Sequence, residues 1–74
     1  MNKQRRKLIS KNINMLENIK IELQDILSDE ELSFDNMPEN LQGSIRGEES
    51  ENAIDNLNEA IDSIDDIVNY LLNI

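Results

Sequence analysis

The stretch from Phe34 to Glu48, FDNMPENLQGSIRGE, holds every backbone breaker of this 74-residue chain. It contains the only proline, Pro38, and both glycines, Gly43 and Gly47. Proline has no amide hydrogen and interrupts a continuous helix, and glycine favours the ends of helices. We therefore expect a corner over about residues 35–46, between two elements that are themselves uninterrupted.

Apolar residues on both sides of the corner recur at steps of three and four, which is the period of one helix face. They predict one helix over about residues 3–34 and a second over about residues 47–73, with no alternation typical of strands. The first stripe consists of Ile9, Ile13, Leu16, Ile19, Leu23, Ile26, Leu27 and Phe34. The second consists of Ile54, Leu57, Ile61, Ile64, Val68 and Leu71, widened by Ala53, Ala60, Ile67 and Ile74.

The corner itself is expected to be ordered. The sequence PENLQ can form one helical turn that begins near Pro38, and Gly43 is placed to end that turn in a left-handed cap. Ser44 can cap the second helix, and the acids from Glu48 onward suit its positive end. The predicted fold is all-α: a single domain over residues 1–74, built as an antiparallel two-helix hairpin with coiled-coil spacing.

Two helices bury only the strip between them, and the apolar stripes of this chain are wider than that strip. Each large side chain left in water forgoes about 1.5–3 kcal/mol of burial. We therefore expect a homodimer that closes a four-helix bundle, or a partner protein that covers the surplus surface. Asn12 lies within the first stripe, where it either fixes the register of a buried interface or is exposed in the first turns.

The net charge of −9 is distributed unevenly along the chain. The first eleven residues carry five bases and no acid, whereas the rest carries all sixteen acids and two bases. Antiparallel pairing is expected to place the basic start beside Asp62, Asp65 and Asp66, at the negative end of the second helix. The acidic body argues against direct nucleic-acid binding, because phosphate binding needs a cationic surface.

The composition excludes several kinds of chemistry. The chain has no cysteine and no histidine, so it lacks thiolate and imidazole metal ligands and the commonest general base. Its acid-dense segments, DEELSFD and DSIDD, lack the ligand spacing and central glycine of a calcium loop. A hairpin offers no enclosed pocket in which two carboxylates could acquire different pKa values. We expect no enzyme activity, no metal and no cofactor.

No apolar run approaches the roughly 18 residues that a membrane span needs. We therefore expect a cytoplasmic protein without a membrane partner.

A row of acids on the second helix is the first candidate site. Its members share one helix face, and most neighbours are separated by roughly 4.5–6 Å along the axis. They are Glu48, Asp55, Glu59, Asp62 and Asp66. This spacing resembles that of charges along a nucleic-acid backbone, so the row could occupy a nucleic-acid-binding groove on another protein. The alternative is the solvated polar face of an amphipathic helix.

The corner is the second candidate site, through Phe34, Met37, Leu41, Ser44 and Arg46. Its apolar members either cover the end of the bundle or anchor a partner. Arg46 is the only base after residue 20. It either clamps a nearby acid, Asp35 or Glu39, or contacts a ligand or partner, and with Ser44 and the free helix amides it could hold an anion.

The corner and the segment ENAIDNLNEAIDSIDDI that follows it resemble a group of small acidic helical-hairpin proteins of phages and prophages of Gram-positive bacteria. The resemblance covers nearly the whole chain. One difference is Ile45, because the group usually has a charged residue at this position. It runs through Lys3, Arg5, Arg6, Lys7, Asp35, Asn36, Pro38, Glu39, Leu41, Gln42, Ser44, Arg46, Gly47 and Glu48. The resemblance implies a genomic setting and not a mechanism.

The leading hypothesis is a non-enzymatic protein-binding module in the cytoplasm of a bacterial host. It would inhibit a host defence protein stoichiometrically, as anti-CRISPR proteins do, with the acidic row steering association and the corner giving specificity. One alternative is an oligomeric sponge that sequesters a nucleotide at subunit interfaces through Ser44 and Arg46. Another is a structural or assembly accessory protein.

Overall fold

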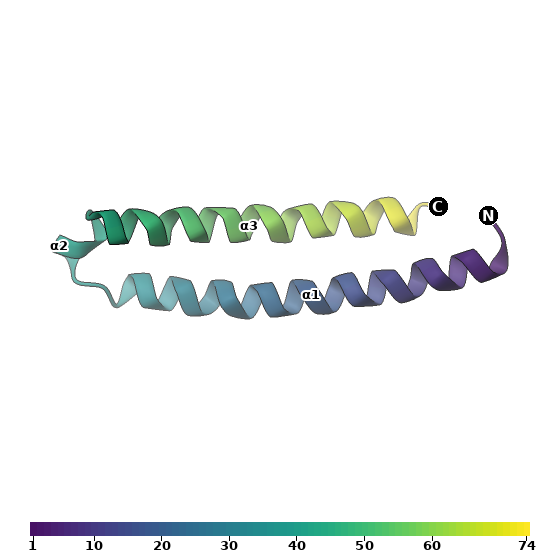
Figure 1. Cartoon of the computed structure of the whole chain (residues 1–74), viewed down its shortest axis with the longest axis horizontal. Helices are drawn as coiled ribbons and strands as arrows, with labels where there is room; N and C mark the ends of the chain where they lie inside the picture. Colours follow the sequence, from purple (N-terminus) through teal and green to yellow (C-terminus); the bar gives the residue numbers. More distant parts are fainter.

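The computed structural model, which describes residues 1–74, is a helical hairpin (Figure 1). Helix α1 spans Lys3–Asp35, the single turn α2 spans Glu39–Gln42, and helix α3 spans Ile45–Leu72. Helices α1 and α3 lie side by side in a rod of 58 × 15 × 12 Å, with α2 at one end and both termini at the other, which we call the open end. The prediction of an all-α hairpin is confirmed. None of the helices combines the length and hydrophobicity needed to cross a membrane.

Polar side chains cap the start of both long helices. The Asn2 side chain accepts a hydrogen bond of 2.8 Å from the backbone amide of Arg5 at the start of α1. Ser44 caps α3 as predicted, because its hydroxyl accepts from the amide of Gly47 at 3.4 Å. The sequence placed the start of this helix at about residue 47, but α3 begins at Ile45, so that Arg46 and Gly47 belong to its first turn.

The corner is ordered by α2, whose single turn confirms the expectation for PENLQ. The Gln42 side chain donates to the carbonyls of Phe34, in the last turn of α1, and Met37, just beyond α1, at 3.1 and 3.2 Å. The left-handed cap predicted at Gly43 is wrong, because its φ is −86°. Here the chain passes directly from α2 into the cap of α3. The amide of Ser44 donates to the Leu41 carbonyl, and no residue between them adopts a positive φ.

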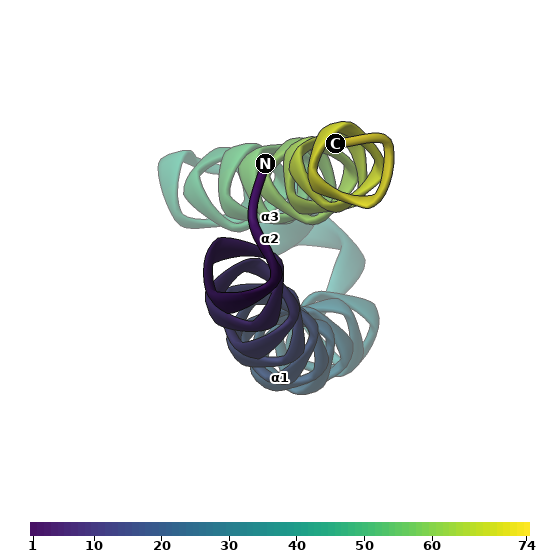
Figure 2. The same ribbon diagram turned by 90° about the vertical axis from the view of Figure 1, so that its right-hand side faces the viewer.

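The contact between α1 and α3 is a narrow seam with alternating steps of three and four residues, typical of coiled-coil packing. Viewed from the open end, the two helices are inclined to each other (Figure 2), as such packing requires. On α1 the seam consists of Ile9, Ile13, Leu16, Lys20, Leu23, Leu27, Glu30 and Phe34, and on α3 of Gly47, Ser50, Ile54, Leu57, Ile61, Ile64, Val68 and Leu71. Ile61 and Val68 are the only large apolar side chains that are buried, at 8% and 6% exposure, so the core of the hairpin is small.

Two seam positions of α1 hold charged residues, which the sequence did not predict. Lys20 and Glu30 continue the steps of the seam and are less exposed than most charged residues of the chain. Each has a partner on α3: Lys20 contacts Asp65 at 2.7 Å, and Glu30 accepts a 2.7 Å hydrogen bond from the hydroxyl of Ser50. These two contacts fix the register of the helices, because sliding one helix would leave both groups partnerless in the seam.

The structure also corrects which residues of α1 were predicted to be buried. Ile19 and Ile26 were assigned to the buried stripe, but they are 45% and 53% exposed and lie beside the seam. Asn12 is exposed too, and its amide donates to the Leu8 carbonyl one turn earlier, so it does not fix a buried register.

The predicted pairing of the basic start with the acids of the second helix is largely wrong. The two ion pairs of the chain both involve Lys20, which contacts Glu17 as well as Asp65. Among the bases of the first eleven residues, Arg6 has a partner near the end of α3, because its guanidinium donates to the carbonyl of Ile74, two residues beyond the helix, at 3.0 Å. It therefore meets a backbone carbonyl beside the negative end of α3 instead of a carboxylate.

Candidate functional site

The acidic row lies along the solvent-facing side of α3. All five members, Glu48, Asp55, Glu59, Asp62 and Asp66, are exposed, and none forms an ion pair or a side-chain hydrogen bond within the chain. The four from Asp55 to Asp66 follow at steps of four, three and four, whereas Glu48 stands two turns away. A regular helix backbone therefore holds them at nearly fixed spacing, with their charges uncompensated.

Lys20 lies at the edge of this acidic surface. Its ammonium contacts Asp65, the neighbour of Asp66, and this hydrogen bond raises the pKa of Lys20 above its ordinary value of 10.5. Glu17 adds a weaker contact at 3.7 Å. Lys20 thus compensates the charge of Asp65, next to the seam, and it forms no ion pair with the carboxylates of the row. The seven-residue spacing from Ile13 through Lys20 to Leu27 is the sequence signal that could have assigned Lys20 to the seam.

Arg46 is exposed at the corner, on the side of the hairpin where α1 ends. No carboxylate lies within 4 Å of its guanidinium, so the clamp onto Asp35 or Glu39 is wrong. The reason is its position in the first turn of α3, which directs it over an open hollow of about 280 Å³. This hollow is lined by Glu30, Ser33, Met37, Arg46, Glu49 and Ser50. Two acidic residues, Glu30 and Glu49, therefore line the same hollow as Arg46.

The other corner residues divide between structural and open positions. Met37 and Leu41 border a second shallow hollow of about 200 Å³, together with Arg46. Phe34 and Met37 are half-buried, and Leu41 is 41% exposed. Ser44 is occupied as the cap of α3, and its hydroxyl also donates to the Leu41 carbonyl. The structure therefore brings Met37, Leu41 and Arg46 together, and it assigns Ser44 to the fold.

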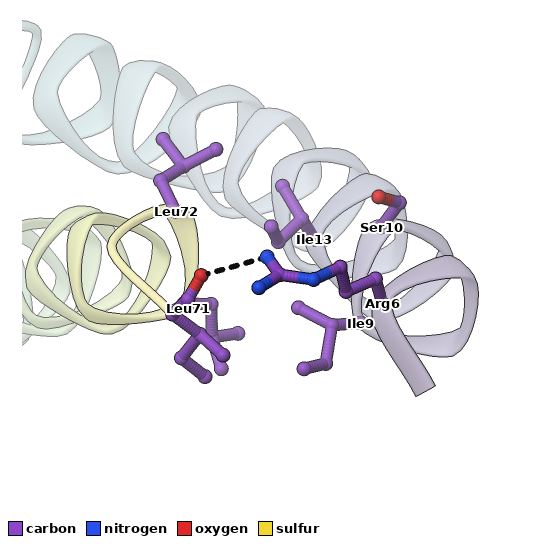
Figure 3. A pocket seen from close by; sticks show the side chains of 7 residues that line it. Arg6, Ile9, Ser10, Ile13, Leu71 and Leu72 are labelled. Atoms are coloured by element: carbon purple, nitrogen blue, oxygen red, sulfur yellow. Dashed lines mark hydrogen bonds between the residues drawn. The ribbon is translucent and has the colours of Figure 1, made fainter. Parts of the chain in front are cut away.

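A third hollow, of about 250 Å³, lies at the open end between the first turns of α1 and the last turns of α3. Figure 3 shows Ile9, Ile13, Leu71 and Leu72 around it, with the guanidinium of Arg6 spanning the gap to the Ile74 carbonyl. The sequence did not single out this place. Five of its seven lining residues are apolar.

The acids do not converge on any point. No group of three or more carboxylates is close enough to hold a metal ion. The chain was also compared with protein-family models, curated proteins and solved structures, and it matches none of them.

Proposed function

We propose that this chain is a non-enzymatic protein-binding module whose acidic row occupies a cationic, nucleic-acid-binding groove on a bacterial host protein. In that role it acts as a stoichiometric inhibitor in the host cytoplasm, in keeping with its resemblance to phage proteins. The observation that carries the proposal is the row itself: five exposed carboxylates on one helix, none of which forms an ion pair within the chain.

The spacing of these charges suits a single nucleic-acid strand better than a duplex. Neighbours from Asp55 to Asp66 are separated by roughly 4.5–6 Å along the helix axis. Duplex DNA carries one charge per about 1.7 Å of axis and each of its strands one per about 3.4 Å. A groove built to contact every phosphate of a duplex would find too few carboxylates on α3. A groove that binds one extended strand would have cationic contacts whose spacing is closer to that of the row.

A long, narrow shape supports the same role. The rod is 58 Å long and 12–15 Å across, with a net charge of −9, or about one negative charge per 6 Å. Such a rod can enter an elongated groove, and its uncompensated field would accelerate association with a cationic partner. The corner residues would contact that partner at one end of the groove, through the exposed Leu41 and Arg46 and the half-buried Met37.

The nucleotide sponge is the weaker candidate. Its anion site would need Arg46, Ser44 and the start of α3, but Glu30 and Glu49 line the same hollow as Arg46. Their charges oppose the binding of a phosphate, and the Ser44 hydroxyl is already engaged in capping. No structural feature favours the role of an assembly accessory protein.

The test begins with capture of host proteins from a bacterial lysate on the immobilised chain, followed by elution with single-stranded DNA. The row is then changed by Asp55→Asn, Glu59→Gln and Asp62→Asn in one variant. The expected result is loss of capture, together with loss of competition between the chain and single-stranded DNA for the purified target.

A matched control removes the same three charges from α1, by Asp25→Asn, Glu31→Gln and Asp35→Asn. These residues are exposed and unpaired, so both variants have the same composition change and the same net charge. The control should retain capture, apart from a modest loss of long-range attraction. Equal inhibition by both variants and the unchanged chain would show that the row does not mimic nucleic acid.

A further inference from the structure

One long side of the hairpin carries large apolar side chains that the seam does not cover. They are Leu8, Met15, Ile19 and Ile26 of α1, Ile67 of α3 and Ile74 just beyond its end, and each is between 44% and 53% exposed. We call this set the apolar face. A monomeric protein rarely leaves so many large apolar side chains in water on one side.

The two halves of the apolar face lie on the same side of the hairpin. On the first helix, Ile19, Ile26 and Ser33 follow at intervals of seven residues and so lie on one side of it. Positions 46, 53, 60, 67 and 74 follow at the same interval on the other, and they begin with Arg46 and end with Ile67 and Ile74. Ser33 and Arg46 line one hollow, so the two series flank the seam on a common side. Glu17 and Asp65 meet around Lys20 on the other side, which separates the apolar face from the ion pairs.

We propose that the apolar face binds a second copy of this chain, head to tail, to form a two-fold symmetric four-helix bundle. The size of the side that carries the apolar face supports a second copy as the occupant. This whole side measures 58 by 15 Å, or about 900 Å², which is close to the roughly 800 Å² per partner that a stable interface buries. A two-fold contact requires the surface to match itself, and an apolar, nearly uncharged stripe does so.

The direction follows from the charges. All five bases of the first eleven residues lie at the open end, and the acids are spread over the rest of the chain. A dimer with both open ends together would gather the ten bases of the two copies at one end of the bundle. The head-to-tail dimer instead lays the basic start of one copy over the acidic middle of the other, with Arg5 opposite Asp29 of the second copy.

The apolar side chains also match in this arrangement. A two-fold axis through the middle of the face sets Met15 opposite Ile19 of the second copy and Leu8 opposite Ile26. On α3 it sets Ile67 opposite the small side chain of Ala60. The acidic row faces away from this contact, so the dimer would display two such rows. The inference does not depend on the proposed function, because the row takes no part in the interface.

Sedimentation equilibrium of the full chain tests the interface. We expect a mass of twice 8.5 kDa at about 100 µM, since interfaces of this area bind with micromolar or tighter affinity. The variant Ile19→Gln with Ile26→Gln should weaken the dimer by roughly 100-fold or more while helicity in circular dichroism is retained. The control Ile21→Gln with Leu32→Gln removes similarly exposed apolar residues outside the face and should leave the dimer intact.

The triple variant of the acidic row should also remain dimeric, which separates this inference from the proposed function. A monomer at about 100 µM would overturn the inference. So would a dimer that the Ile19 and Ile26 substitutions leave unchanged.

The direction is tested by a spin label at Glu39→Cys, an exposed corner position in a chain without other cysteines. The head-to-tail dimer places the two labels roughly 60 Å apart, at 1.5 Å per helical residue. A dimer with both corners together would place them within roughly 20–30 Å, and that distance would overturn the proposed direction. As a second measure, Arg5→Glu should weaken the dimer by up to roughly tenfold, and Asp29→Arg in the same chain should restore it.

Discussion

The substitution Gly47→Ala tests the close approach of α2 to α3, on which the geometry of the corner depends. A Cβ added at Gly47 would overlap the carbonyl oxygen of Gln42 and lie 2.5 Å from its carbonyl carbon and 2.7 Å from its Cα. All three atoms belong to the backbone, so no change of rotamer can relieve the overlap. The turn α2 would have to move away from α3 by about 1.4 Å, because ordinary contacts begin near 3.4 Å.

The cost of that movement can be worked out from its parts. Overpacking of this kind costs about 1–3 kcal/mol. The displacement also strains the two hydrogen bonds of the Gln42 side chain to the carbonyls of Phe34 and Met37, which contribute about 0.5–1.5 kcal/mol each. Alanine recovers up to about 1 kcal/mol through its higher helix propensity. We expect Gly47→Ala to lower the free energy of unfolding by about 1–3 kcal/mol, or Tm by roughly 5–20 °C in a domain of this size.

Gly43 offers the matched control, four residues away in the same corner. No atom lies within 4 Å of a Cβ added there, and its φ of −86° is accessible to alanine. Gly43→Ala should therefore stabilise the fold by about 0.4–1 kcal/mol, because it restricts the unfolded chain. The two variants are compared by urea and thermal unfolding at equal chain concentration. Equal stabilities would refute the close approach of α2 to α3.

Two further predictions concern the seam. Ile61→Ala should lower the free energy of unfolding by about 2–4 kcal/mol, because Ile61 is only 8% exposed. The control Ile45→Ala, at a position 76% exposed, should change it by less than about 0.5 kcal/mol. Urea unfolding measures both variants, and similar losses would contradict the assigned core. The raised pKa of Lys20 in the folded chain means that its contribution to stability is complete below its unfolded pKa and is lost as the pH rises through the folded value. The stability difference between the unchanged chain and Lys20→Met should thus stay constant from about pH 7 to 10 and decline above that, and a flat difference up to about pH 12 would show that the Asp65 contact is absent in solution.

Charged residues within the seam give the hairpin its register at little cost. A purely apolar seam of this period can slide by a heptad with modest loss, since one isoleucine or leucine replaces another. Lys20 and Glu30 remove that freedom, because each finds its partner, Asp65 or Ser50, in one register only. Both side chains keep some contact with water, which limits the desolvation that a buried charge would suffer.

Local chemistry explains why the sequence sufficed for the architecture. The periods of three and four predict two helices in any context, Pro38 forbids their fusion, and Ser44 has the hydroxyl that a helix start requires. The acidic row could be placed on one face for the same reason, because a helix fixes the spacing of its own side chains. These features depend on residues close in sequence, and no knowledge of packing was needed to find them.

Contacts between segments distant in sequence were decided only by the tertiary structure. Whether Ile19 or Lys20 enters the seam depends on which side of α1 meets α3, and the stripe alone allowed both. Gly47 has to be a glycine because the backbone of α2 lies against it, and its own φ does not require one. The sequence could not show this contact, and the left-handed φ that it predicted at Gly43 is absent. Arg46 has no clamp because the first turn of α3 directs it over a hollow. A sequence pattern specifies which faces can pack, but the relative rotation and approach of two helices emerge only when all their side chains are fitted together.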